Sequence, residues 1–291
     1  SSVGLGVANQ GSGVITGCAS GSGWAVAEEM AARNWRIFAT ARKPEDWQRI
    51  EAEGWNAVAL DVTSSASIEQ AVATVLDATD GALDGVVNNA GFGMPGAIED
   101  LSREAMQLQF EVNLFGAVEL TNRLLPSLRK RPQGRVVYIS SLVGRMSLPF
   151  MGIYSASKFA LEAVADAQRI ELSMTPVRVV LIEPGPIETR FSATCARVGE
   201  SELEADGSRF RSAYERYFKQ RRDGGMSEDR FRLPPEAVAK KVAHALISDR
   251  PKVRYPVTLP TYVADFLVRF VPVSWRDAVM QRQVKKRFGS D

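Results

Sequence analysis

Tyr154 and Lys158 stand four residues apart in a segment with helical periodicity, so both side chains emerge on one face of a helix. Ser141, thirteen residues earlier, follows a strand-like run. A phenol titrates at about 10 and is a poor base at neutral pH, but a neighbouring ammonium group favours the phenolate. These residues predict proton transfer at a carbonyl or alcohol oxygen, with Tyr154 as acid or base, Lys158 lowering its pKa and Ser141 holding the oxygen.

A glycine-rich loop early in the chain supports this chemistry. The segment Thr-Gly-Cys-Ala-Ser-Gly-Ser-Gly at 16–23 follows an apolar run and leads into a helical pattern. Glycines let the backbone approach a pyrophosphate closely, and a helix N-terminus presents free N–H groups to it. The loop therefore predicts a dinucleotide site, with a tight glycine turn that binds nothing as the alternative. The residues expected to contact the cofactor are Gly17, Ser20, Gly21, Ser22 and Gly23.

The charge after the second strand-like run bears on which dinucleotide binds. The sequence there reads Thr-Ala-Arg-Lys at 40–43, where an NAD-specific protein would usually offer a carboxylate to the ribose hydroxyls. A guanidinium can fork onto a 2′-phosphate, whereas a carboxylate would repel it. Arg42 therefore favours NADP(H) over NAD(H), and an ordinary solvated basic turn is the alternative.

The elements that must position these residues alternate between strand-like and helical patterns, which is typical of repeated βαβ units. We expect strands at Val14–Thr16, Arg36–Thr40, Ala57–Leu60, Gly85–Asn88, Arg135–Ser140, Val177–Ile182 and Lys252–Val257. We expect helices at Trp24–Arg33, Ser67–Ala78, Arg103–Leu125, Tyr154–Met174 and Pro235–Ser248. The fold class is α/β: a Rossmann-type, doubly wound, seven-stranded parallel sheet with helices on both faces, in a single domain at 13–260 after a disordered N-terminal arm at 1–12.

Composition excludes several other functions. A formal charge of +2 from 36 basic and 34 acidic side chains gives no field that would hold nucleic acid. Two cysteines, Cys18 and Cys195, and one histidine, His244, make a disulfide framework, a closed zinc site and a His-based triad poor explanations, so we expect no metal. Without a signal-peptide pattern or an 18-residue apolar window, we expect a cytoplasmic protein with no integral membrane segment.

Over about residues 13 to 260 the chain resembles a short-chain dehydrogenase/reductase, most closely the hydroxysteroid and retinol dehydrogenase branch. The resemblance rests on the glycine loop, the Tyr154/Lys158 pair and four further motifs. These are Leu-Asp-Val-Thr at 60–63, Asn-Asn-Ala-Gly at 88–91, Asn113, and Pro-Gly-Pro-Ile-Glu-Thr at 184–189. Two positions depart from the family: Ser22 replaces the usual apolar residue, and Ser20 replaces the basic residue that often accompanies a basic position 42.

The resemblance implies a role for each motif. Asp61 and Val62 should meet the adenine, and Asn113 should hold a proton-relay water through a kinked helix. The cofactor cleft should be lined by Asn89, Ala90 and Gly91, and the nicotinamide carboxamide should be bound by Ile187 and Thr189. Pro184 and Gly185 should also contact the cofactor. The branch implies NADP(H)-dependent hydride transfer to or from a bulky apolar alcohol or ketone, such as a steroid, retinoid or lipid-like compound. A dinucleotide-responsive sensor without turnover is the competing function, but it would have no need of Tyr154 and Lys158.

An insertion at 190–233 is dense in charge and carries Phe210, Tyr214, Tyr217 and Phe218 at helical spacing. We expect this segment either to dock on the body or to form a lid over an apolar substrate pocket, at the sheet edge where ligands bind. With Ser141 and Tyr154, the side chains expected to line the pocket are Phe92, Met94, Met146, Leu148 and Phe150. Ordinary loop packing is the alternative for the apolar ones.

Two further regions could meet partners. The resemblance implies a homodimer or homotetramer through the helices at 103–125 and 154–174, unless both merely face their own sheet. The C-terminal amphipathic segment at 261–291 is basic: residues 251–291 hold eight Lys or Arg against three Asp, interspersed with aromatics. A solvated charged tail is the more usual structure of such a segment, and weak contact with an anionic membrane surface is the alternative.

Overall fold

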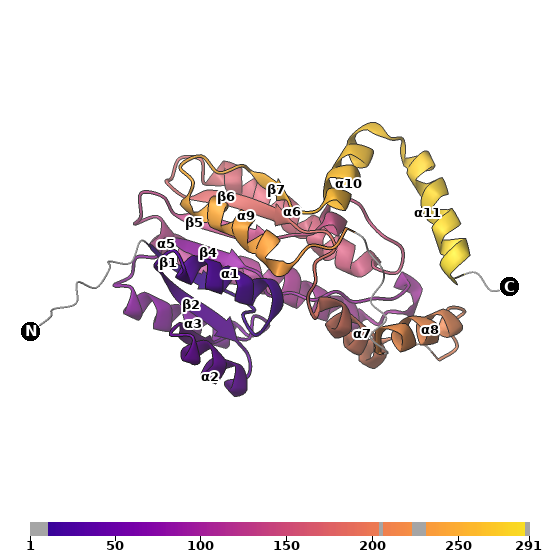
Figure 1. The fold of residues 1–291 in the computed structure, drawn as a ribbon, viewed down its shortest axis with the longest axis horizontal. Helices are drawn as coiled ribbons and strands as arrows, with labels where there is room; N and C mark the ends of the chain where they lie inside the picture. The colour runs from indigo at the N-terminus through magenta and orange to yellow at the C-terminus, as the bar shows by residue number, and fades with distance from the viewer. Residues whose placement is uncertain (1–10, 204–205, 223–230, 289–291) are drawn as a thin grey trace, which may run out of the picture.

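A seven-stranded parallel sheet forms the centre of the protein, in the order β3-β2-β1-β4-β5-β6-β7 (Figure 1). The structure, a computed structural model, describes residues 11–203, 206–222 and 231–288, so most of the predicted N-terminal arm lies outside the described residues. The strands are β1 (Gly11–Ile15), β2 (Trp35–Ala41), β3 (Asn56–Ala59), β4 (Gly85–Asn88), β5 (Arg135–Ile139), β6 (Arg178–Glu183) and β7 (Arg254–Pro256). The predicted doubly wound sheet is therefore confirmed.

The sheet begins two residues before the predicted domain boundary at residue 13. Gly11 and Ser12, which the sequence assigns to the arm, pair with Trp35 and Arg36 of β2. A side chain at Gly11 would meet the Trp35 indole, because its Cβ would lie 2.8 Å from a ring carbon. The small residues that make the start of β1 look unlike a strand are thus explained by the tryptophan packed against them.

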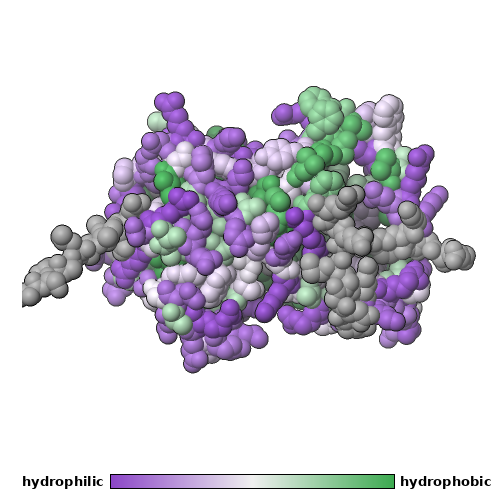
Figure 2. Space-filling model, in the orientation of Figure 1, coloured by the Kyte–Doolittle hydropathy of each residue, from purple (hydrophilic) through white to green (hydrophobic). Residues whose placement is uncertain are grey.

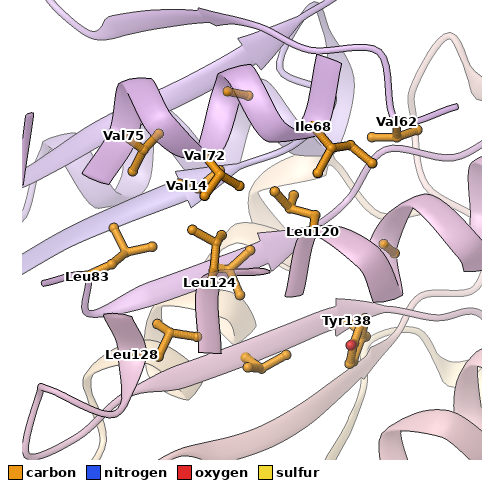
Figure 3. Packing of buried hydrophobic residues seen from close by; sticks show 14 of the residues in the cluster. Val14, Val62, Ile68, Val72, Val75, Leu83, Leu120, Leu124, Leu128 and Tyr138 are labelled. Atoms are coloured by element: carbon orange, nitrogen blue, oxygen red, sulfur yellow. The ribbon is translucent and has the colours of Figure 1, made fainter. Parts of the chain in front are cut away.

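Helices cover both faces of the sheet, and the alternation of side chains along each strand separates two apolar cores. On one face lie α1 (Gly21–Ala31), α2 (Pro44–Ala52) and α9 (Pro235–Ile247). On the other lie α3 (Ser65–Ala78), α5 (Gly116–Leu128) and α6 (Gly152–Glu171). Figure 3 shows this second core, where Val72 of α3 and Leu120 and Leu124 of α5 pack with Val14 of β1.

The helix predicted over Arg103–Leu125 is interrupted. It comprises α4 (Arg103–Phe110), a π-helical turn (Glu111–Phe115) and α5, which runs on to Leu128. Gly116 allows α5 to start against the end of the β3 segment, since a Cβ there would lie 2.1 Å from the Val62 carbonyl oxygen. The turn places Asn113 on the active-site side of the bend.

Four more helices lie at the carboxyl edge of the sheet or extend from it (Figure 1). The insertion forms α7 (Phe191–Glu202) and α8 (Arg211–Arg222), and the C-terminal segment forms α10 (Leu259–Phe270) and α11 (Val273–Phe288). Figure 1 shows α10 and α11 as a bent arm that leaves the end of the sheet and returns toward α8. Within the described part of the chain, no helix is both long and apolar enough to cross a bilayer.

Candidate active site

Ser141, Tyr154 and Lys158 meet at one cavity of about 310 Å³ at the carboxyl edge of the sheet. Ser141 follows β5 by two residues, and Tyr154 and Lys158 occupy the first two turns of α6. The Ser141 side chain hydrogen-bonds the Tyr154 hydroxyl. Parallel strands end at a common edge, which is why Ser141 after β5 can reach a helix that begins eleven residues later. The structure therefore brings the predicted trio together.

The environment of Tyr154 differs from the expectation that Lys158 lowers its pKa. Burial raises the pKa of the Tyr154 phenol above its ordinary value, and only the hydrogen bond with Ser141 opposes that effect. The Lys158 Nζ lies 6.0 Å from the centre of the tyrosine ring and donates a hydrogen bond of 2.8 Å to the Ile139 carbonyl. Desolvation of the buried phenol thus dominates, and Tyr154 is protonated at neutral pH.

Lys158 is itself buried, which lowers its pKa from 10.5 to about 8, while the nearby Glu162 carboxylate raises it. Glu162 lies one turn further along α6 and accepts a hydrogen bond of 3.1 Å from Nε of Arg254. The same Arg254 pairs with Asp166 at 2.7 Å and with the buried Glu183 at 3.3 Å. Sequence reasoning missed this charge cluster behind Lys158. The available signal was a carboxylate four residues after Lys158 and another at the end of a buried strand.

Asn113 anchors the loop that follows β4. Its Oδ1 accepts a hydrogen bond of 3.1 Å from the Phe92 N–H, and its Nδ2 donates to the Phe92 carbonyl at 2.9 Å and to Ser157 Oγ at 3.1 Å. A Cβ at Gly91 would lie 3.1 Å from the Asn113 Oδ1 and 3.7 Å from the Lys158 Nζ. Asn113 and Gly91 therefore lie close to the Lys158 amine of the trio.

The glycine loop is shaped for close approach. Gly17 and Gly21 have φ of +72° and +63°, values that side-chain-bearing residues rarely adopt. At Gly23 a Cβ would lie 2.3 Å from the Gly17 carbonyl oxygen and 2.6 Å from Nδ2 of Asn89, so only glycine fits. Thr16, a residue not predicted as functional, accepts hydrogen bonds from the N–H groups of Asn89 and Ala90 at 2.9 and 2.8 Å and so fixes the β4 loop against this turn.

Apart from Gly23, the residues predicted for the cofactor line connected cavities along the sheet edge. A cavity of about 560 Å³ is bordered by Gly17, Ser20, Arg42, Asp61, Val62, Ala90 and Gly91. The cavity of the trio is bordered by Ser22, Asn89, Gly91, Pro184, Gly185, Ile187 and Thr189. Gly21 lines a third cavity with Ser20 and Thr189. The glycines expose the backbone of the loop, and the N-terminus of α1 lies directly after it. Both features fit the binding of a dinucleotide phosphate.

Asp61 and Arg42 set the charge at the far end of the larger cavity. Burial acts to raise the pKa of Asp61, but hydrogen bonds from the Thr63 N–H and hydroxyl, together with the Arg42 guanidinium, lower it below its ordinary value. The Thr63 bonds measure 2.9 and 2.7 Å. Asp61 is therefore ionised and held in place, and the exposed Arg42 is the cation beside it at this end of the cavity.

An apolar cavity of about 300 Å³ adjoins the trio and shares Phe191 and Ser192 with its cavity. The Phe191 and Tyr154 ring centres are 5.7 Å apart. The insertion packs on the body of the protein and also borders this cavity. Tyr214 and Phe218 of α8 are buried and line the cavity. Its other lining residues include Leu148 and Phe150, as predicted, and Cys195, Met280 and Val284, which sequence reasoning did not assign to it.

Met94 and Met146, which were predicted to line the substrate pocket, lie elsewhere, and Phe92 borders the larger cavity of Arg42 and Asp61 rather than the apolar one. Met94 is fully buried in a separate cluster with Phe92, Leu101 and Ala105, so its placement argues against substrate contact. Met146 borders neither the trio's cavity nor the apolar one. The sequence places both residues in active-site loops, but a loop position does not determine which side chains turn inward. Met94 packs in the interior cluster because a side chain there buries more apolar surface than one that lines a cavity.

Comparison with known proteins identifies the family. Residues 13–197 match the family model described as short chain dehydrogenase. An uncharacterized oxidoreductase of Escherichia coli, YbbO, is 42% identical over 92% of this chain and 93% of its own length. The NADPH-dependent 3-dehydrocapnine reductase of Ornithobacterium rhinotracheale is 34% identical over 94% and 97%. Human retinol dehydrogenase 16 is 33% identical over 91% and 86%.

A solved structure has the same architecture. A short-chain dehydrogenase from Streptomyces avermitilis superimposes with a TM-score of 0.73 at 28% identity, over 95% of this chain and 96% of that one. The chain belongs to the short-chain dehydrogenase family. It is an NAD(P)-dependent oxidoreductase acting between CH–OH and carbonyl groups, close to the retinol dehydrogenase branch.

Proposed function

We propose that the protein is an NADP(H)-dependent reductase or dehydrogenase of a bulky apolar carbonyl or alcohol compound of steroid-, retinoid- or lipid-like character. The observation that carries the proposal is the junction of two cavities: the one holding Ser141, Tyr154 and Lys158 shares Phe191 and Ser192 with the apolar one. A carbonyl carbon held between the trio and the nicotinamide side would leave its apolar remainder against the rings of Phe191, Tyr214 and Phe218.

The residues of the trio have distinct tasks in the proposed reaction. A nicotinamide cofactor held by the glycine loop would supply the hydride for the carbonyl carbon, or accept it from the alcohol. Ser141 holds the carbonyl oxygen by a hydrogen bond, and the protonated Tyr154 hydroxyl donates its proton to that oxygen as the alcohol forms. The Lys158 ammonium stabilises the resulting phenolate, and the Ile139 carbonyl keeps its Nζ in position. The oxidation of an alcohol uses the same groups in reverse.

The preference for NADP(H) rests on Arg42 at the far end of the larger cavity. Its guanidinium suits a 2′-phosphate, and two hydrogen bonds from Thr63 hold the neighbouring Asp61 carboxylate in place. The name of the Ornithobacterium relative includes NADPH dependence, which supports the same choice.

A turnover panel tests the function. The purified protein is titrated with NADPH and NADH and assayed with retinoid, steroid, long-chain aliphatic and short water-soluble carbonyl compounds. We expect NADPH oxidation with at least one apolar class, at a higher kcat/KM than with the short compounds. Tight NADPH binding without cofactor oxidation across the whole panel would favour the dinucleotide-responsive sensor.

We also propose that the chain works in the cytoplasm as a homodimer or homotetramer. Phe115 beside α5 and Phe159 on α6 are 52% and 44% exposed, and these are the helices that the family resemblance assigns to subunit contact. Apolar rings on a helix surface gain free energy when a second subunit covers them. Light scattering of the purified protein should give at least twice the 31.8 kDa chain mass, and Phe159→Glu should shift it toward the monomer.

A further inference from the structure

An apolar stripe runs along the outward face of α10. Its five side chains are spaced i, i+3, i+4, i+7 and i+11 and are 47% to 65% exposed: Leu259, Tyr262, Val263, Phe266 and Phe270. At about 100° per residue they share one helix face, while Thr261 and Ala264 on the opposite side are buried. An amphipathic helix normally turns its apolar face toward the core. This helix does the reverse, and no described part of the chain covers its apolar face.

The stripe continues onto α11, where Val273, Trp275 and Val279 are 61%, 70% and 53% exposed. Among the described residues, eight of the 18 large apolar side chains that are exposed thus fall within 259–279. Figure 2 shows the concentration of hydrophobic residues at the upper right of the molecule, over α10 and the start of α11. We call residues 259–288 the C-terminal arm.

Charge distinguishes between possible occupants of this surface. The C-terminal arm contains six Lys or Arg and two Asp, and one of those acids, Asp265, is paired with Arg145 of the body at 2.9 Å. Arg269 is exposed and lies at the edge of the stripe. Two such positive arms would repel each other, whereas an anionic lipid surface attracts them. Tyr262 and Trp275 belong to the two residue types that are enriched at the boundary between headgroups and acyl chains.

The arm also forms part of the site. Met280, Gln283 and Val284 of α11 line the apolar cavity together with Tyr214 and Phe218 of α8. One continuous segment thus presents an apolar stripe to the outside and a wall to the cavity beside Phe191. A compound dissolved in a bilayer would meet the cavity wall at the place where the arm lies on the membrane.

We propose that the C-terminal arm docks on an anionic membrane surface, with the α10 stripe in the interfacial layer, and passes membrane-dissolved carbonyl or alcohol compounds to the apolar cavity. The docking stands on the arm alone, and the passage of substrate rests on the proposed function. Docking buries the rings of Phe266 and Phe270 and removes their apolar surface from water. Removing both rings should therefore lower vesicle affinity at least tenfold.

Vesicle flotation tests the docking. The full chain is mixed with vesicles of phosphatidylcholine, with or without phosphatidylglycerol, at low and high salt. We expect co-flotation with the anionic vesicles that weakens as salt rises, and its loss in the double variant Phe266→Ser and Phe270→Ser and in Arg269→Glu. The matched control, Met174→Ser with Ile247→Ser, removes two exposed apolar side chains outside the arm and should float like the parent. Failure of the parent to float, or equal loss in the control, would overturn the proposal.

Two additional readouts separate the alternatives. If the stripe is covered by a second copy instead, the Phe266→Ser and Phe270→Ser variant will have a lower mass by light scattering without vesicles, and that result would also overturn membrane docking. Reduction of a short water-soluble carbonyl compound should be unchanged in this variant, while reduction of a long-chain one presented in vesicles should fall. A parent that floats but reduces none of the panel would contradict the proposed function and leave the docking supported.

Discussion

At the residue scale, the proposed chemistry depends on a protonated phenol beside a lysine of lowered pKa. Burial raises the pKa of Tyr154, which favours proton donation, and lowers the pKa of Lys158 to about 8, which places the loss of its charge within an accessible pH range. The protonation states of the two groups therefore respond differently as pH rises. The phenol keeps its proton, while the amine loses the charge that would stabilise a phenolate.

The first prediction concerns this pH dependence. Because the folded-state pKa of Lys158 is lowered from 10.5 to about 8, its positive charge is present below that value and is lost above it. We expect kcat for carbonyl reduction at saturating NADPH to decline as pH rises through about 8. In Lys158→Met, kcat should be lower by roughly two orders of magnitude, without a limb near that pH. An identical limb in parent and Lys158→Met would show that another group titrates there.

Cofactor choice is the second prediction at this scale. Arg42→Ala should raise the KM for NADPH by roughly 10- to 100-fold, because a charge-assisted hydrogen bond to a phosphate contributes about 1.5 to 3 kcal/mol. The KM for NADH should change less than about twofold. Arg33→Ala in the turn after α1, which removes a surface arginine paired with Glu29, is the control and should alter neither. Equal losses for both cofactors would contradict the role of Arg42 as the 2′-phosphate contact.

Sequence patterns predict the trio because its members are local to one strand end and one helix start. They do not predict the Arg254 cluster, whose partners Glu162 and Glu183 come from α6 and β6 and whose arginine comes from β7. Nor do they predict that burial outweighs Lys158 at the Tyr154 hydroxyl, since the degree of burial depends on α7 and Phe191 folding over the ring. Spacing identifies reacting residues, whereas their pKa values depend on long-range packing.

At the element scale, the turn between β1 and α1 forms the proposed dinucleotide site at the sheet edge. The third prediction is that Gly23→Ala lowers NADPH affinity at least tenfold, since its Cβ would meet the Gly17 carbonyl at 2.3 Å and displace the loop. Fluorescence titration with NADPH measures this effect. Gly13→Ala is the matched control, because its Cβ would have ordinary contacts of 3.5 Å. Unchanged affinity in Gly23→Ala would mean that the loop geometry does not serve the cofactor.

The order of the strands and main helices can be predicted from the sequence more readily than the short helix α2 or the orientation of α10. Alternating apolar runs indicate every strand, with ends that differ by up to three residues, because hydrophobic periodicity persists across each element. Helix α2 was not predicted, since only Ile50 of it is fully buried. The outward stripe of α10 escaped prediction for a different reason: an amphipathic pattern shows that one face is apolar but not which way that face turns.

At the scale of the whole molecule, a buried charge cluster joins the last strands to α6. Within this cluster, burial disfavours the charged form of Glu183. Burial raises the pKa of Glu183 from 4.5 to about 7, and the neighbouring Glu162 acts in the same direction. Between those values the folded state binds more protons than the unfolded state does. The stability of the protein should therefore fall as pH rises through this window.

The fourth prediction follows from that sign. Relative to Glu183→Gln, the free energy of unfolding of the parent should decrease by roughly 1 to 3 kcal/mol between pH 5 and pH 8. Urea denaturation at several pH values measures the difference. The exposed Glu53→Gln, at the end of α2, serves as the control. A parent whose stability rises relative to Glu183→Gln over the same interval would show that Arg254 more than compensates the buried carboxylate.

The central claim is that the Tyr154 hydroxyl supplies the proton for carbonyl reduction, and a single-turnover comparison of the parent with Tyr154→Phe tests it most directly. Both proteins are saturated with NADPH and mixed with the best carbonyl compound of the panel, and cofactor oxidation is followed in time. We predict equal NADPH affinity and a rate at least 10²-fold slower in Tyr154→Phe. Equal rates in the two proteins would contradict the account.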